Sequence, residues 1–195
     1  MMAVLRHMRR GGARRIVNIA SIGGKVSVPH LLPYSASKYA LVGLSEGFHA
    51  ELAREGITVT TVCPGLMRTG STYNAQFKGD HEHEFGWFHL AASTPGLSMN
   101  AERAARQIID ACRHGDAELI IGLPARLAIA LNGVAPNLVS ATLAGVNRLL
   151  PKASGADGDE LRSGWRSAST FPASAVTRLT DWAAAKNNEL PVLGR

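Results

Sequence analysis

The sequence is poor in cysteine, in aromatic residues and in charge. Of its 195 residues, 6% are aromatic and 18% charged, whereas 46% are hydrophobic, and only two are cysteines. Cys63 and Cys112 cannot make a disulfide framework or a four-ligand zinc site, so we expect a reducing, cytoplasmic location and no metal. The high apolar content excludes an intrinsically disordered protein. Length and composition together predict one globular domain.

Acidic residues are absent from the first fifteen positions, which contain five arginines. Three interpretations stay open: an Arg-rich targeting segment, a small phosphate- or lipid-binding patch, or an exposed helix end before a turn at Gly11 and Gly12. We favour the helix end, because a core pattern begins directly after it. The net charge is +6, but the rest of the chain is nearly balanced. We therefore predict no nucleic-acid partner, which would need basic residues spread over one surface.

Short apolar, β-branched runs alternate with helical patterns along the first two thirds of the chain. The runs at 15–20, 57–62 and 119–121 predict buried strands. Helical patterns at 34–55 and 100–115 separate them, each ending at a glycine. Parallel strands joined by helices imply right-handed crossovers. The predicted fold class is α/β, a partial Rossmann-like, doubly wound parallel sheet of about three strands with flanking helices.

The remaining segments give weaker signals. We expect irregular structure at 66–98. The uncharged stretch 127–147 is interrupted by Pro136, which favours two short helices over a membrane span. These helices would cover the sheet or, as the less favoured alternative, contact a membrane surface. We expect 1–151 to form the sheet-containing unit, with an apolar helical segment at 124–151. Residues 152–195 would form a linker over 152–170 and a helix from about 173 to 188. Its predicted inner face consists of Val176, Leu179, Trp182 and Ala183.

Tyr34 and Lys38 are four residues apart at the start of a predicted helix, so their side chains meet on one face. A nearby ammonium stabilises a phenolate and lowers a pKa that is ordinarily about 10, which makes Tyr34 a candidate proton donor and acceptor. Ser21 ends the first strand, at the carboxyl edge where open α/β sheets bind ligands. Pro64 and Gly65 end the next strand at the same edge, and a glycine there allows backbone to approach a flat ligand.

Three segments together resemble the short-chain dehydrogenase/reductase family. They are Ile16-Val17-Asn18-Ile19-Ala20-Ser21, Tyr34-Ser35-Ala36-Ser37-Lys38 and Cys63-Pro64-Gly65-Leu66-Met67-Arg68-Thr69. The resemblance runs from about residue 1 to residue 121. It implies an oxidoreductase that interconverts an alcohol and a carbonyl by hydride transfer with NAD or NADP.

By this resemblance, Ser21 positions the substrate carbonyl, Tyr34 is the acid/base, and Lys38 lowers the tyrosine pKa and holds the nicotinamide ribose. Pro64, Gly65 and Thr69 would line the nicotinamide site beside Tyr34 and Lys38. Residues 70–98 match the family's variable substrate loop. The substrate would be a small alcohol or ketone, with a preference for a hydrophobic one from the apolar segment near the end of the chain. The resemblance also implies a homo-oligomer through the Tyr34 helix. Gly43 and Gly47 on that helix suit close backbone packing, which an intrachain contact would explain equally well.

The sequence also lacks features of that family. A glycine-rich turn after the first strand, an Asn-Asn-Ala-Gly-like segment and a catalytic asparagine have no counterpart, and no G-x-G-x-x-G occurs. The chain therefore resembles the C-terminal part of such an enzyme, without the pyrophosphate and adenosine site. The choice between NAD and NADP stays open. We expect the isolated chain to be poorly soluble or oligomeric, because the first strand would have an exposed edge, and to turn over no carbonyl substrate.

Rival interpretations rest on single motifs. Gly43-Leu44-Ser45-Glu46-Gly47 matches the G-x-S-x-G of serine hydrolases, but it lies within a helical pattern rather than at a strand-to-helix turn. His81-Glu82-His83-Glu84 fails the zinc pattern H-E-x-x-H, because Phe85 follows. A non-enzymatic alternative is a truncated, inactive family member that acts as an interaction or oligomerisation partner.

Overall fold

The computed structural model describes residues 2–12, 14–152, 160–168 and 176–190. A three-stranded parallel sheet has the order β1 (Arg15–Ile19), β2 (Thr58–Pro64) and β6 (Glu118–Ile121). Ile19 pairs with Val62, and Val62 pairs with Leu119, so the three strands end at one edge. β2 is buried from Val59 to Pro64 because it is the central strand. The predicted α/β class and strand positions are confirmed.

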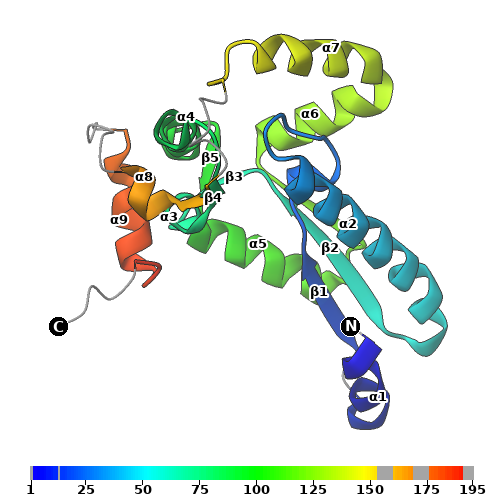
Figure 1. Ribbon diagram of the computed structural model, residues 1–195. Helices are drawn as coiled ribbons and strands as arrows, with labels where there is room; N and C mark the ends of the chain where they lie inside the picture. The colour runs from blue at the N-terminus through cyan, green and yellow to red at the C-terminus, as the bar shows by residue number, and fades with distance from the viewer. Residues whose placement is uncertain (1, 13, 153–159, 169–175, 191–195) are drawn as a thin grey trace.

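Helices cover both faces of this sheet (Figure 1). α2 (Leu32–Leu52) packs through Val42 against Cys63, whereas α5 (Ala101–His114) packs through Ala104 against Val62. Adjacent residues of β2 thus face opposite layers, as the alternation of a strand requires. We call β1, β2 and β6 with α1, α2 and α5 the sheet body.

Local signals in the sequence set the ends of these helices. α2 continues into η2 (Ala53–Glu55), which stops at Gly56 with a φ of 66°. Asn100 caps α5 by accepting hydrogen bonds from two backbone amides, and Gly115 ends it with a φ of 78°. α1 (Met2–Gly11) packs Leu5 and Met8 onto the core. The predicted helix end at the start of the chain is confirmed.

Two short helices follow β6, at the carboxyl end of the sheet (Figure 1). α6 (Leu123–Val134) and α7 (Pro136–Asn147) meet at Ala135, which confirms the predicted break at Pro136. Within the described parts of the chain, no helix is both long and apolar enough to cross a membrane.

The expectation of irregular structure at 66–98 is wrong. This segment contains β3 (Leu66–Arg68), α3 (Ser71–Asn74), β4 (Gln76–Phe77), α4 (His81–Ser93) and the start of β5 (Ser98–Asn100). Apolar periodicity could not reveal α4, because its buried residues are Phe85, Gly86, His89, Ala92 and Ser93. A helix whose inner face includes histidine, glycine and serine has no clear hydrophobic stripe.

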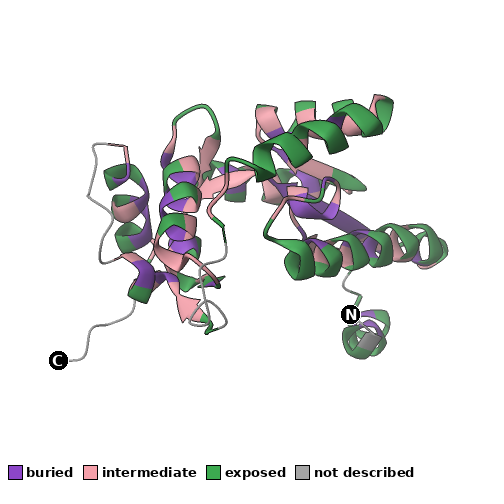
Figure 2. Ribbon diagram, turned by 45° about the horizontal axis from the view of Figure 1, so that its top comes forward, coloured by how far each residue is buried: buried purple, intermediate pink, exposed green. Residues whose placement is uncertain are grey.

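Residues late in the chain complete this second region. β7 (Arg162–Ser163) pairs antiparallel with β4, and α8 (Gly164–Ser167) and α9 (Arg178–Lys186) pack beside α3 and α4. We call residues 66–100, 160–168 and 176–190 the distal lobe. Figure 1 shows this lobe across the sheet from α2, and Figure 2 shows buried residues in both regions.

The predicted inner face of the last helix is only partly right. Ala183 is buried together with Thr180 and Ala184, whereas Leu179 is 42% and Trp182 61% exposed. The helix buries small side chains, which allow close packing, and leaves its largest apolar ones exposed. The predicted start near 173 and positions 153–159 and 169–170 of the predicted linker lie outside the described residues. The linker prediction is wrong for 160–168, which contains β7 and α8.

Candidate active site

Ser21 lies just beyond β1 and caps η1 (Ile22–Gly24). Its Oγ accepts a hydrogen bond from the backbone N–H of Gly23 at 3.1 Å. This bond uses a lone pair of the hydroxyl and not its proton. The Ser21 O–H is therefore available as a donor at the carboxyl edge of the sheet.

Tyr34 and Lys38 occupy the first turns of α2 and share one face. The Lys38 ammonium lies 5.5 Å from the centre of the Tyr34 ring and donates a hydrogen bond to the carbonyl of Ile19 at 3.3 Å. This bond ties the start of α2 to the end of β1. Tyr34 is 43% exposed, so its ring faces solvent rather than the core.

Gly23 shows how closely Ser21 and Tyr34 approach each other. A Cβ placed on Gly23 would lie 3.1 Å from Cε1 of Tyr34 and 3.6 Å from Oγ of Ser21. Serine hydroxyl and tyrosine ring thus border the same small space, which a side chain at this position would fill. The structure brings Ser21, Tyr34 and Lys38 together at the edge where β1 ends.

The candidate nicotinamide residues lie along the chain leaving β2. Pro64 is buried at the strand end, and the N–H of Gly65 donates to the carbonyl of Ile121 at 2.9 Å. A Cβ on Gly65 would lie 3.1 Å from that of Ala125, so this glycine permits close packing against α6. Thr69 belongs to the distal lobe, where its hydroxyl donates to Ser71 at 2.9 Å.

Sequence reasoning missed several charged and polar groups next to the candidate site. Lys25 forms ion pairs with Glu46 of α2 at 2.5 Å and Glu118 of β6 at 2.8 Å. Burial alone would lower the pKa of Lys25, but the two carboxylates outweigh it and raise that pKa above its usual value. Burial raises the pKa of the Cys63 thiol, which suits a core residue rather than a reactive one. No sequence pattern links these positions before the sheet is formed.

Ser45 lies inside α2 and is fully buried. Its hydroxyl donates to the Leu41 carbonyl at 2.6 Å and accepts from the Asn18 amide at 2.8 Å. The strand-to-helix turn that a nucleophilic serine needs is absent at this position. Ser45 instead anchors α2 to β1.

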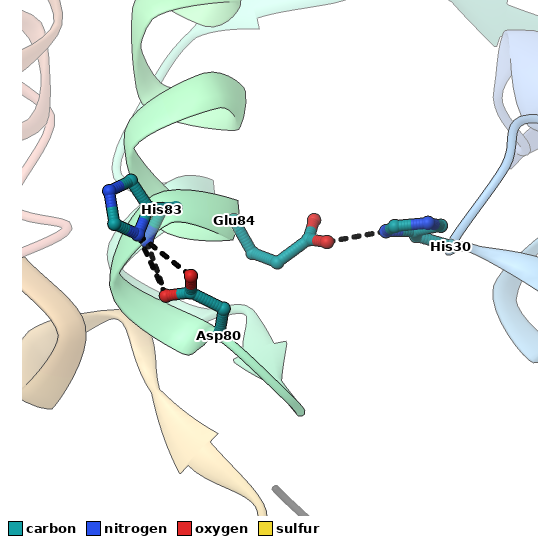
Figure 3. Close-up of polar contacts among 4 residues, drawn as sticks. All are labelled: His30, Asp80, His83 and Glu84. Atoms are coloured by element: carbon teal, nitrogen blue, oxygen red, sulfur yellow. Dashed lines mark hydrogen bonds and ion pairs between the residues drawn. The ribbon is translucent and has the colours of Figure 1, made fainter. Parts of the chain in front are cut away.

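The histidine-rich segment forms separate pairs rather than a cluster (Figure 3). Asp80 caps α4 and contacts Nδ1 of His83 at 2.8 Å, and this hydrogen bond lowers the pKa of Asp80 and raises that of His83. Glu84 points the other way and contacts His30, which precedes α2 and has a φ of 64°. The described residues include no group of three metal-ligating side chains. The His30–Glu84 contact joins the loop beside the candidate site to the distal lobe, and no motif signalled it.

A parallel sheet with serine, tyrosine and lysine gathered at its carboxyl edge defines a Rossmann-like α/β protein. A family model described as short chain dehydrogenase matches residues 1–78. Taken with the relatives described next, this match supports a member of the short-chain dehydrogenase/reductase family, and the chain resembles the C-terminal part of longer relatives.

Two curated relatives illustrate the similarity. A putative ketoacyl reductase of Streptomyces coelicolor is 56% identical over 62 residues, which are 32% of this chain and 24% of the relative. The putative oxidoreductase SadH of Mycobacterium tuberculosis is 34% identical over 130 residues, covering 64% of this chain and 45% of SadH. The chain therefore spans less than half the length of each.

Solved structures show the same fold. A short-chain dehydrogenase from Streptomyces avermitilis is 28% identical with a TM-score of 0.54, over 76% of this chain and 55% of that one. A short-chain dehydrogenase from Burkholderia cenocepacia in complex with NADP is 24% identical with a TM-score of 0.57, over 73% of this chain and 52% of that one.

Proposed function

We propose that this chain supplies the acid/base side of an NAD- or NADP-dependent oxidoreductase that interconverts an alcohol and a carbonyl. The observation that carries the proposal is the shared space that Ser21 and Tyr34 border at Gly23, with Lys38 above the tyrosine ring. Relatives named as ketoacyl reductase and oxidoreductase support this reaction class.

The two hydroxyls have complementary tasks at the substrate oxygen. The Ser21 O–H donates to that oxygen, because the bond from the Gly23 amide occupies one lone pair of Oγ and not the hydroxyl proton. Tyr34 gives its phenolic proton to the same oxygen during reduction and takes it back during oxidation. The exposed ring leaves room for a substrate to approach.

The donor set also fits the nicotinamide end of a dinucleotide. The Lys38 ammonium has three protons, and the one bond to Ile19 leaves two for the hydroxyls of the nicotinamide ribose. Pro64, Gly65 and Thr69 are proposed to form the wall along the nicotinamide ring. When bound, NAD or NADP supplies or accepts the hydride.

The outer face of α2 supports pairing with a second copy. Gly43 and Gly47 are exposed, and a Cβ on either would meet nothing within 4 Å. Small residues allow two helices to approach closely, so we propose a homo-oligomer through this helix.

The test uses a chain extended upstream by the glycine-rich half of a Streptomyces relative. Tyr34→Phe keeps the ring but removes the proton, and we expect kcat for carbonyl reduction to fall by about 10²–10⁴-fold. Tyr39→Phe is the matched control, because Tyr39 lies on the same helix with the same 43% exposure, and its kcat should stay unchanged. Near-wild-type turnover by Tyr34→Phe would reject Tyr34 as the acid/base. If the extended chain without substitutions does not bind NADH or NADPH, the alternative is favoured, in which the chain is an inactive family member that acts as an interaction partner.

A further inference from the structure

The last described helix is held firmly against the distal lobe. Thr180 is fully buried and accepts a hydrogen bond from Ser93 of α4 at 2.7 Å. Asp181 accepts a hydrogen bond from the Tyr73 hydroxyl at 2.5 Å and lies 3.2 Å from Nε2 of His89. These contacts fix the position of α9 against α3 and α4.

The chain then reverses at Asn188, which has a φ of 56°. The N–H of Glu189 donates to the Ala184 carbonyl at 3.0 Å, and the N–H of Asn188 donates to that of Ala185 at 3.2 Å. This pair of bonds is a Schellman motif, in which asparagine tolerates the left-handed conformation. The direction in which Glu189 leaves the helix is thereby fixed.

Glu189 reaches the turn that follows Thr69. Its carboxylate accepts a hydrogen bond from the Gly70 N–H at 2.5 Å, across 119 positions of sequence. Asn74 donates to the Gly70 carbonyl at 3.0 Å and to the Glu189 carbonyl at 3.5 Å. A Cβ on Gly70 would lie 2.8 Å from that of Glu189, so the two backbones are packed as closely as a glycine permits.

We propose that Glu189 is a positioning residue for the nicotinamide wall. The Thr69 carbonyl and the Gly70 N–H belong to one planar peptide, so a bond that holds this N–H orients the Thr69 end of the turn. This inference rests on the proposed function, in which Thr69 faces the nicotinamide. The C-terminal segment is thus part of the cofactor-facing structure, although it lies far from the family motifs in sequence.

The first test measures amide hydrogen exchange in the 195-residue chain. Glu189→Ala should speed exchange at Gly70 by about tenfold, because a charge-assisted bond is lost, and Glu189→Gln should have a smaller effect because an acceptor remains. Glu102→Gln is the matched control, since it removes the ion pair of Glu102 with Lys186 on α9 but leaves Gly70 untouched. Unchanged exchange at Gly70 in Glu189→Ala would overturn the proposal.

The turn at Asn188 gives an independent pair of variants. Asn188→Gly keeps a residue that adopts positive φ freely, whereas Asn188→Ala does not. We expect faster exchange at Gly70 in Asn188→Ala and wild-type exchange in Asn188→Gly. Equal behaviour of the two variants would contradict the role of this turn in directing Glu189.

The second test measures binding of reduced nicotinamide mononucleotide, which contains only the nicotinamide end. Glu189→Ala should weaken binding by about tenfold, while Glu102→Gln should match the wild type. Faster exchange with unchanged affinity would show that the contact does not serve the cofactor. If the wild-type chain does not bind the mononucleotide, the proposed function is rejected. The exchange result alone decides whether Glu189 holds the turn.

Discussion

The sheet body and the distal lobe both bury polar groups, but the clusters of buried aliphatic side chains lie in the body, whereas hydrogen bonds between buried side chains join the elements of the lobe. The body buries aliphatic side chains such as Ile57, Val59 and Val62, each with no exposed surface. The lobe buries Thr72, Ser93 and Thr180 just as completely. Burial of aliphatic groups is favourable in many orientations, whereas a buried hydroxyl requires a partner at the right place. The body therefore tolerates adjustment, and the lobe depends on particular hydrogen bonds.

His89 is at the centre of the buried polar network in the lobe. Its Nδ1 lies 2.9 Å from the Thr72 hydroxyl, and its ring stacks on Phe85 with 5.0 Å between ring centres. Tyr73 stacks on Trp165 at 4.5 Å and donates to Asp181. Burial and the Asp181 carboxylate both raise the pKa of Tyr73, so this phenol remains a donor. Each hydrogen bond here keeps a buried polar group paired, so removing one partner is costly.

The largest effect is expected from a cavity in the body. Ile57→Ala should lower the free energy of unfolding by about 2–5 kcal/mol, because the site is closed off by Leu5, Leu52 and Val59. Urea denaturation measures the change. Ile109→Ala removes the same atoms from a side chain that is 51% exposed, and it should cost far less. Similar costs for the two variants would show that the body is not held by buried aliphatic packing.

A smaller effect is expected from one missing hydroxyl in the lobe. Tyr73→Phe keeps the stacked ring but removes the donor to Asp181, which should cost about 1–3 kcal/mol. Hydrogen exchange should rise in α4 and α9 and stay unchanged in β2. A uniform rise across both regions would remove the distinction between them. Tyr39→Phe provides the control, because no hydrogen-bond partner is described for the Tyr39 hydroxyl.

The smallest expected effect is a loss of stability of the lobe, but not of the body, at acid pH. Burial lowers the pKa of His89 below its ordinary 6.5, and the nearby Asp181 opposes this only in part. Between the two values the unfolded chain binds a proton that the folded lobe does not, so stability is present above about pH 6.5 and falls as the pH drops below it. Hydrogen-exchange protection in α4 and α9, taken relative to the intrinsic exchange rate at each pH, should therefore fall between pH 7 and pH 5, before protection in β2 falls.

His89→Gln removes this titrating group and should flatten the pH dependence of the lobe. A variant that keeps the full pH dependence would assign it to another group. The exposed His83 offers the matched control, since His83→Gln should leave the pH dependence of α9 in place.

The difference between the regions also explains what the sequence could reveal. Strands 15–20, 57–62 and 119–121 combine β-branched residues with glycine at their borders, so each is recognisable from local pattern. Tyr34 and Lys38 are neighbours on a helix, and Ser21 ends a strand, so their meeting follows from the fold class. Fixed spacing along one motif made this part of the candidate site predictable.

The distal lobe could not be found in this way. β4 and β7 contain two residues each and pair across more than eighty positions of sequence. The buried face of α4 includes the polar residues His89 and Ser93, so no hydrophobic stripe marks it. The same holds for Glu189, whose contact with Gly70 depends on where α9 docks. Local pattern carries no information about such pairings, because they form only between elements that are already placed.

The pairing of β4 with β7 has a consequence for synthesis on the ribosome. Every described strand of the sheet has been synthesised once residue 121 has been added, so the body has these strands early. The lobe must wait for Arg162 and Ser163, and then for α9, to close contacts of long sequence separation. Such contacts form late because the intervening loop must first be ordered. The part of the molecule nearest Thr69 is thus the last to mature, even though most of its residues precede those of β6.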